Sequence, residues 1–137
     1  MPLSDTQLVS TGILVLIVIT IAFGGTFLLR VATGRHEANA LQKSFFRAGH
    51  AHAGVLVILG MVIELFVTLG GVAAPWSWLS GGVLFSAILI PAGFFLSVLG
   101  QDPARPSRLI VLLWAGVASL VIGLVGAGVG LIAAGMG

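Results

Sequence analysis

Residues 47–69 read RAGHAHAGVLVILGMVIELFVTL, and this stretch decides how the rest of the chain is interpreted. It opens with an arginine and two histidines and continues as an apolar run. The run is long enough to cross the hydrocarbon core of a bilayer, which takes about 20 helical residues. The whole chain of 137 residues has the same character, with 58% hydrophobic and only 7% charged residues. Soluble domains carry about 25% charged residues, so we predict an integral membrane protein.

Three further apolar runs of similar length predict a single membrane domain over residues 1–137. The expected fold class is all-α, an integral membrane four-helix bundle. Ser4 or Asp5 is expected to cap the first helix, and Ser107 the fourth. Pro91 predicts a kink or a local opening in the third span, because proline removes one backbone hydrogen bond. The expected spans are about residues 8–30, 48–70, 78–100 and 108–134.

The basic residues predict the orientation of the bundle. All six lysine and arginine residues fall in the first and third loops or at their edges, namely Arg30, Arg35, Lys43, Arg47, Arg105 and Arg108. In a four-span protein these two loops share a side of the membrane. The positive-inside rule then places loops one and three in the cytoplasm and the N- and C-termini outside. We expect a multi-pass protein of the inner (plasma) membrane of the cell.

Several kinds of chemistry are excluded by composition. The chain has no cysteine, so disulfides, thiolate metal sites and thiol catalysis are absent. No nucleotide-binding fingerprint occurs, and the serines have no nearby base. The small excess of basic residues is a topology signal rather than a nucleic-acid-binding patch. The expected partner is therefore the lipid bilayer, with no nucleic acid.

His50 and His52 are the main candidates for chemistry. Two residues apart on a helix corresponds to roughly 200° of rotation, so the side chains are expected on nearly opposite faces. One metal ion held by both is not expected from a regular helix, because paired helical ligands are spaced three or four residues apart. Both could be amphipathic side chains at the membrane interface. Intramembrane ionisable residues are also candidates for a functional site, and the two interpretations stay open.

Other candidates surround these histidines. Glu64 lies about 21 Å further along the helix than His50, and is either a snorkelling or packing carboxylate or a relay or substrate-binding group. Met61 is interpreted as core filler in preference to a metal ligand. Arg30 and Arg47 either anchor the topology or pair with an anionic group such as a phosphate. Phe94 and Phe95 either pack in the core or line a planar apolar cofactor, and Gly126 and Gly130 predict close helix packing within or between subunits.

Two segments resemble a known family. Arg47-Ala48-Gly49-His50-Ala51-His52-Ala53-Gly54 is similar to the opening of the second helix in styrene oxide isomerase and in hydroxylaminobenzene mutase. Ala92-Gly93-Phe94-Phe95-Leu96 resembles a segment of the third helix of the isomerase. These are small four-helix membrane proteins, distantly similar to the haem-bearing helices of haem-copper oxidases.

The resemblance implies haem b, bound by a histidine of the second helix at a subunit interface of a trimer. The His-x-Gly pattern maps onto His52, and the Arg-Ala-x-His pattern maps onto His50, so both are kept as candidate iron ligands. Arg30 and Arg47 would then be propionate partners, and Phe94 and Phe95 would lie near the cofactor.

The departures from the family pattern leave the reaction open. The tyrosine that positions the epoxide in the isomerase corresponds to Phe95, and its asparagine falls near Ile58. Neither side chain can donate a hydrogen bond. Isomerase-like chemistry on a small apolar substrate therefore stands beside electron transfer or sensing. The alternatives are a haem-free structural or accessory membrane subunit, or a metal or proton carrier that uses His50, His52 and Glu64.

Overall fold

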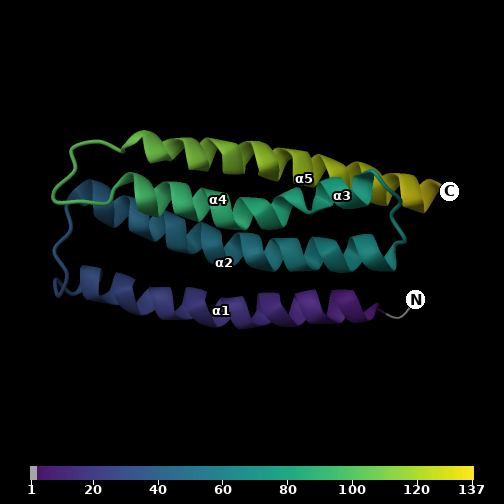
Figure 1. Cartoon of the computed structure of the whole chain (residues 1–137), viewed down its shortest axis with the longest axis horizontal. Helices are drawn as coiled ribbons and strands as arrows, with labels where there is room; N and C mark the ends of the chain where they lie inside the picture. Colours follow the sequence, from purple (N-terminus) through teal and green to yellow (C-terminus); the bar gives the residue numbers. More distant parts are fainter. Residues whose placement is uncertain (1–2) are drawn as a thin grey trace.

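The computed structural model of the chain describes residues 3–137, and within that range it contains helices and no strand (Figure 1). Four helical segments are long and apolar enough to cross a membrane: Asp5–Ala32, Ala40–Leu69, Trp76–Ser97 and Arg108–Met136. This confirms the prediction of an all-helical chain with four candidate membrane spans. The elements are α1 (Asp5–Ala32), α2 (Ala40–Leu69), α3 (Trp76–Ser80), α4 (Gly82–Ser97), the short 3-10 helix η1 (Arg108–Ile110) and α5 (Val111–Met136).

The N-terminal caps follow from short polar side chains. Ser4 accepts a hydrogen bond from the backbone N–H of Gln7, whose side chain accepts one in return from the N–H of Ser4. Ser107 accepts from the N–H of Leu109 at the start of η1. The predicted cap at Ser107 is thus confirmed, and of the two residues predicted to cap the first helix, Ser4 is the one that does so.

Helix α2 begins about eight residues earlier than the sequence analysis expected, at Ala40. Asn39 and Gln42 form a capping box, with each side chain accepting a hydrogen bond from the backbone N–H of the other at 2.9 and 3.0 Å. The helix has 30 residues and is therefore about 45 Å long, more than the roughly 30 Å hydrocarbon thickness of a bilayer.

The start of α2 is also fastened to the third loop. The buried Gln42 amide donates hydrogen bonds to the carbonyls of Val98 and Gly100, both at 3.1 Å. The Asn39 amide donates to an Asp102 carboxylate oxygen at 2.8 Å and to the Pro103 carbonyl at 2.9 Å. The two basic loops are thus joined to each other at one end of the bundle.

The third span is interrupted at Gly81, between α3 and α4, at a position that the sequence did not predict. Pro91 is buried inside α4, which continues unbroken to Ser97. Next to the interruption α4 lies close to α5, because a Cβ atom on Gly82 would come within 2.6 Å of the Ser119 carbonyl oxygen. The Ser119 hydroxyl donates a hydrogen bond to the Gly82 carbonyl at 2.8 Å, which satisfies a backbone acceptor at the interruption.

The glycines of α5 pack against α3 and α4 of the same chain. A Cβ atom on Gly116 would meet Ile90 at 2.6 Å, and one on Gly123 would meet the backbone nitrogen of Val83 at 2.5 Å. A Cβ atom on Gly126 would meet Leu79 at 2.5 Å. Because these positions carry no side chain, the helix backbones lie in direct contact. The small-residue face therefore serves packing within the chain.

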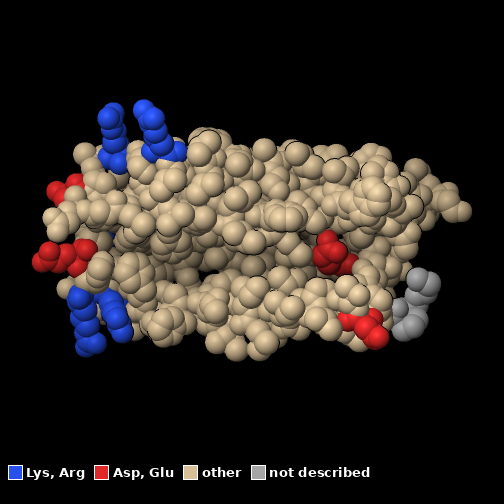
Figure 2. Space-filling view, viewed as in Figure 1, with Lys and Arg blue, Asp and Glu red and all other residues tan. Residues whose placement is uncertain are grey.

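Helix α1 stands apart from the rest. Among the described elements its backbone approaches α2 alone, and Val31 is its one buried residue. Figure 1 shows α1 at the edge of the bundle beside α2, with both termini at one end. Figure 2 shows the lysine and arginine side chains at the opposite end, where loops one and three lie. Loops one and three thus share one end of the bundle, as the orientation prediction requires.

Candidate functional site

His50 lies in the contact between α1 and α2. It is half-buried, and its imidazole occupies the space that Gly24 and Gly25 of α1 leave open. A Cβ atom on Gly25 would lie 3.6 Å from the imidazole Cε1 and Nε2, and one on Gly24 would lie 3.7 Å from Nδ1. His50 is therefore a spacer between two helices, with its ring edge against backbone.

His52 has a different setting, on the outer surface of α2 beside α4. Its side chain is exposed, and its ring centroid lies 5.3 Å from that of Phe94. The imidazole Nδ1 is 2.7 Å from the carbonyl oxygen of Ala48. A carbonyl can only accept, so Nδ1 carries the hydrogen and donates it. The expectation of opposite faces agrees with these two placements.

Four phenylalanines fill the contact between α2 and α4 at the level of the histidines. Phe46 stacks on Phe95 with ring centroids 5.6 Å apart, and Phe45 meets Phe94 edge to face at 5.4 Å. Gly49 provides the room, because a Cβ atom there would come within 2.8 Å of the Phe95 ring. Phe94 and Phe95 are both partly buried and each packs against a core cluster, and Phe94 also lies beside the exposed His52. The sequence analysis overlooked Phe45 and Phe46, although their position on the face of Gly49 was a usable signal.

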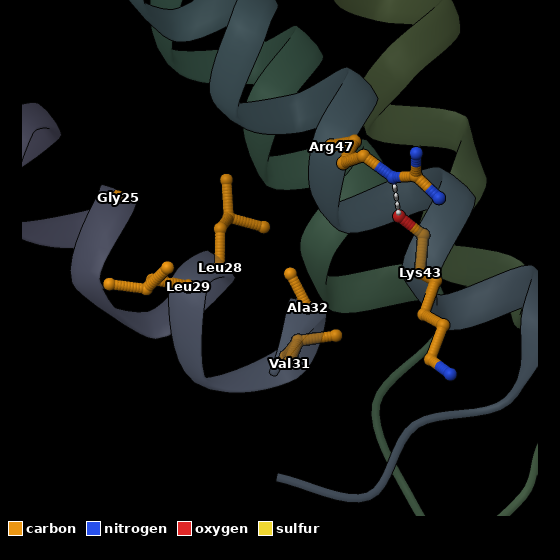
Figure 3. Close-up of a pocket in the computed structure, with 7 residues that line it drawn as sticks. All are labelled: Gly25, Leu28, Leu29, Val31, Ala32, Lys43 and Arg47. Carbon is orange, nitrogen blue, oxygen red and sulfur yellow. Dashed lines mark hydrogen bonds between the residues drawn. The ribbon is translucent and has the colours of Figure 1, made fainter. Parts of the chain in front are cut away.

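A cleft of about 550 Å³ opens between α1 and α2 at the basic end (Figure 3). Apolar residues of α1, including Gly25 and Leu28, form one side, and Lys43 and Arg47 of α2 form the other. The Arg47 Nε donates a hydrogen bond to the Lys43 carbonyl at 3.3 Å. Arg47 and His52 are about 140° apart around the helix. This cleft therefore belongs to the side of α2 that faces α1.

The structure brings only part of the candidate set together. Arg47 and His50 lie on the α1 side of α2, whereas His52 and Phe94 share the opposite side. Arg30 is exposed near the end of α1 and does not line the cleft that contains Arg47.

The two positions that replace the isomerase's tyrosine and asparagine do not share a pocket. Phe95 is packed against Phe46 and Gly49, whereas Ile58 is 60% exposed on the outside of α2. Both side chains are hydrocarbon, so neither can position a polar substrate through a hydrogen bond.

Met61 and Glu64 lie away from the histidines. Met61 packs against the core cluster formed by Leu56, Val57, Ala87 and Ile90, in agreement with its interpretation as filler. Glu64 is about 18 Å from His52 along the helix and accepts a hydrogen bond from the Ser80 hydroxyl at 3.3 Å. Within residues 3–137, no three histidine, aspartate or glutamate side chains lie close enough to hold a metal ion.

Comparison with known proteins gives no match to a family model, to a curated protein or to a solved structure. The similarity to the styrene oxide isomerase and hydroxylaminobenzene mutase families stays a prediction carried by the two short motifs in α2 and α4.

Proposed function

We propose that this protein binds haem b in the membrane, with His52 as the axial ligand of the iron. The observation that carries the proposal is the 2.7 Å contact between the His52 Nδ1 and the Ala48 carbonyl. Metal-bound histidines characteristically donate their second ring nitrogen to a carbonyl or carboxylate, which fixes the tautomer and raises the basicity of the ligating nitrogen. His50 is the weaker candidate, because Gly24 and Gly25 of α1 cover its ring.

The side chains around His52 fit one edge of such a group. Phe94 offers an apolar wall 5.3 Å from the imidazole, and the His52 side chain is exposed on the surface of the bundle. A haem held there has its other side open to a neighbouring copy of the chain, which supports a homo-oligomer, with a trimer expected from the family resemblance. Arg47 lies around the helix from His52, so it would reach a propionate bound by that neighbour and not its own.

Haem b held by an imidazole supplies a redox-active iron or, with an open sixth position, a site for a small ligand. The chain's own part is to orient the imidazole through Ala48, to exclude water with Phe94 and to hold the group at the histidine end of α2. Because Phe95 and Ile58 carry no hydrogen-bond donor, we favour electron transfer or ligand sensing over isomerisation of a small apolar substrate.

The test is an absorption spectrum of protein purified from cells supplied with haem. The expected result is a Soret band that His52→Ala removes and His50→Ala retains, since the second variant is the matched control on the same turn of helix. A band lost in His50→Ala alone would move the ligand to His50. No band in the unaltered protein would favour a haem-free accessory subunit, and zinc or copper without iron would favour a metal carrier.

The oligomeric state needs its own measurement. Mass determination in a mild detergent is expected to give a homo-oligomer, with the trimer as the first expectation. A strict monomer that keeps its Soret band would contradict the interface between copies, while leaving His52 as the ligand.

The proposed orientation places loops one and three in the cytoplasm and both termini outside, in the plasma membrane of the cell. Its support is that all six lysine and arginine residues fall in loops one and three or at their edges, and the basic side chains visible in Figure 2 lie at one end of the bundle. The absence of cysteine makes the test clean, because single cysteines at Ser44 and Ala73 can be labelled in intact cells by an impermeant reagent. We expect labelling at position 73 and none at position 44, and the reverse pattern would invert the orientation.

A further inference from the structure

A second set of polar groups lies at the other end of α2 from the histidines. Glu64 accepts a hydrogen bond from Ser80 of α3 at 3.3 Å, and Gln7 of α1 donates one to Thr68 of α2 at 2.8 Å. Glu64, Gln7 and Thr68 line a common cleft of about 470 Å³ together with Ser77. Three different elements thus direct oxygen-bearing side chains to one place in an otherwise apolar bundle.

An apolar groove leads away from this polar cluster. It has a volume of about 530 Å³ and lies between α1 and α4, with Ala53 and Val57 of α2 as its floor and Glu64 at one end. Leu14 and Ile21 line the α1 side, and Phe85 the α4 side. The groove exists because the backbone of α1 approaches α2 alone. Figure 2 shows the surface hollowed along this seam beside α1.

The length of the groove matches a hydrocarbon chain. From residue 53 to residue 64 the helix advances about 16 Å. With carbon–carbon bonds of about 1.5 Å, an extended alkyl chain of roughly twelve carbons covers that distance. Glu64 lies about 8 Å before the end of α2 at Leu69, so a head group at Glu64 sits near the membrane surface. The tail then runs parallel to the lipid chains, toward the middle of the bilayer.

The charge of this end selects the head group. Every lysine and arginine of the chain lies within residues 30–47 or 105–108, and the three histidines lie within residues 36–52. The residues that line the groove include Glu64 and no basic side chain. A carboxylate in such a setting is stabilised by a counter-charge, whereas an anionic phosphate or carboxylate head is repelled.

We propose that this groove binds a single-chain amphiphile with a cationic amine or quaternary ammonium head. The head pairs with the Glu64 carboxylate, which lines both the groove and the adjoining polar cleft. The alkyl tail fills the groove between α1 and α4 over Ala53. Neither His50 nor His52 takes part, so an experiment that contradicts haem binding does not contradict amphiphile binding in the groove, and the reverse also holds.

The test uses the tryptophans of the chain as reporters. Trp76 and Trp78 belong to α3 at the Glu64 end, and Trp78 lines the cleft that contains Glu64. Trp114→Phe removes the third tryptophan, and this variant is placed in phosphatidylcholine bilayers. A dodecylammonium probe with a nitroxide next to its head is expected to quench the remaining fluorescence with saturation. Dodecyltrimethylammonium should reverse the quenching, and dodecanol at the same membrane concentration should not.

Two sets of variants test the contact with the head group and the contact with the alkyl tail separately. Glu64→Gln keeps the shape of the side chain and is expected to weaken probe binding at least tenfold, while Asp5→Asn, the other acidic group at this end, leaves it unchanged. Ala53→Leu fills the floor of the groove and should weaken the dodecyl probe at least threefold without affecting a butyl analogue. Absent or non-saturating quenching, equal binding by Glu64→Gln, or equal displacement by dodecanol would overturn the proposal. An unchanged dodecyl affinity in Ala53→Leu would overturn the placement of the tail.

Discussion

The contact between α4 and α5 and the contact between α1 and α2 both use glycine, with opposite results. In α5, Gly123 lies against the backbone of Val83, so the two helices close on each other without a gap. In α1, Gly24 and Gly25 face the imidazole of His50, so a polar ring stands between the helices. The first arrangement leaves no room for a ligand. The second leaves a cleft at the basic end and a groove toward the other end.

The two contacts therefore differ in how closely their helices pack. Helices α3, α4 and α5 pack closely on one another, and residues of α1 line each of the clefts described above. Helices that pack through small residues gain close van der Waals contact in lipid, where no hydrophobic effect drives association. A helix held off by a histidine has less of that contact, so α1 should be easier to displace than α5.

The largest expected effect comes from breaking the closed contact. Gly123→Leu places a side chain where even a Cβ atom would lie 2.5 Å from the backbone nitrogen of Val83. We expect a loss of about 3 kcal/mol in unfolding free energy, because a backbone cannot give way as a side chain can. Unfolding followed by circular dichroism in a denaturing detergent measures it. Gly128→Leu on the same helix meets nothing within 4 Å and serves as the control. Similar losses in both variants would contradict the closed contact.

A smaller effect is expected at the open contact. Gly25→Leu presses on the His50 ring, which is a side chain and can turn aside. We expect a loss of about 1–2 kcal/mol in the same unfolding measurement. Gly12→Leu, elsewhere on α1 and facing open space, should change little. A penalty for Gly25→Leu as large as that for Gly123→Leu would show that α1 is packed as tightly as α5.

The smallest effect concerns a single hydrogen bond across the closed contact. Ser119→Ala removes the hydroxyl that donates to the Gly82 carbonyl at 2.8 Å, and we expect a loss of about 1 kcal/mol in unfolding free energy. The hydroxyl of Ser10 bonds to the Thr6 carbonyl of its own helix, so Ser10→Ala should be near neutral. Equal losses of unfolding free energy in Ser119→Ala and Ser10→Ala would mean that the Ser119 hydrogen bond does not stabilise the contact between α4 and α5.

The four spans could be predicted from the sequence, because the length of an apolar segment is set by the thickness of the bilayer and does not depend on how the helices pack. The opposite directions of His50 and His52 followed from helical rotation alone. The start of α2 was misplaced because the stretch before Arg47 was interpreted as loop from its polarity. Within that polar stretch, however, Asn39 and Gln42 have the spacing of a capping box, and this signal for a helix start is stronger than the polarity.

Other features could not be predicted from one sequence. Which neighbour each histidine meets depends on the arrangement of helices in space, since Gly24 and Gly25 are far from His50 along the chain. The packing of Phe94 and Phe95 against α2 depends on Gly49, and the groove at Glu64 depends on how far α1 stands from α4. The break between α3 and α4 lies at Gly81, whereas Pro91, where the sequence predicts a kink or a local opening, lies inside α4.

The hydrogen bonds that join Asn39 and Gln42 to the third loop have a consequence for how the protein is made. Their partners are Val98, Gly100, Asp102 and Pro103. A chain synthesised from its N-terminus completes α1 and α2 well before these acceptors exist. The first turn of α2 can pack against α1 at once, but its hydrogen bonds to the third loop can form only after the third span has left the ribosome. The link between loops one and three is thus completed only after three of the four spans have been synthesised.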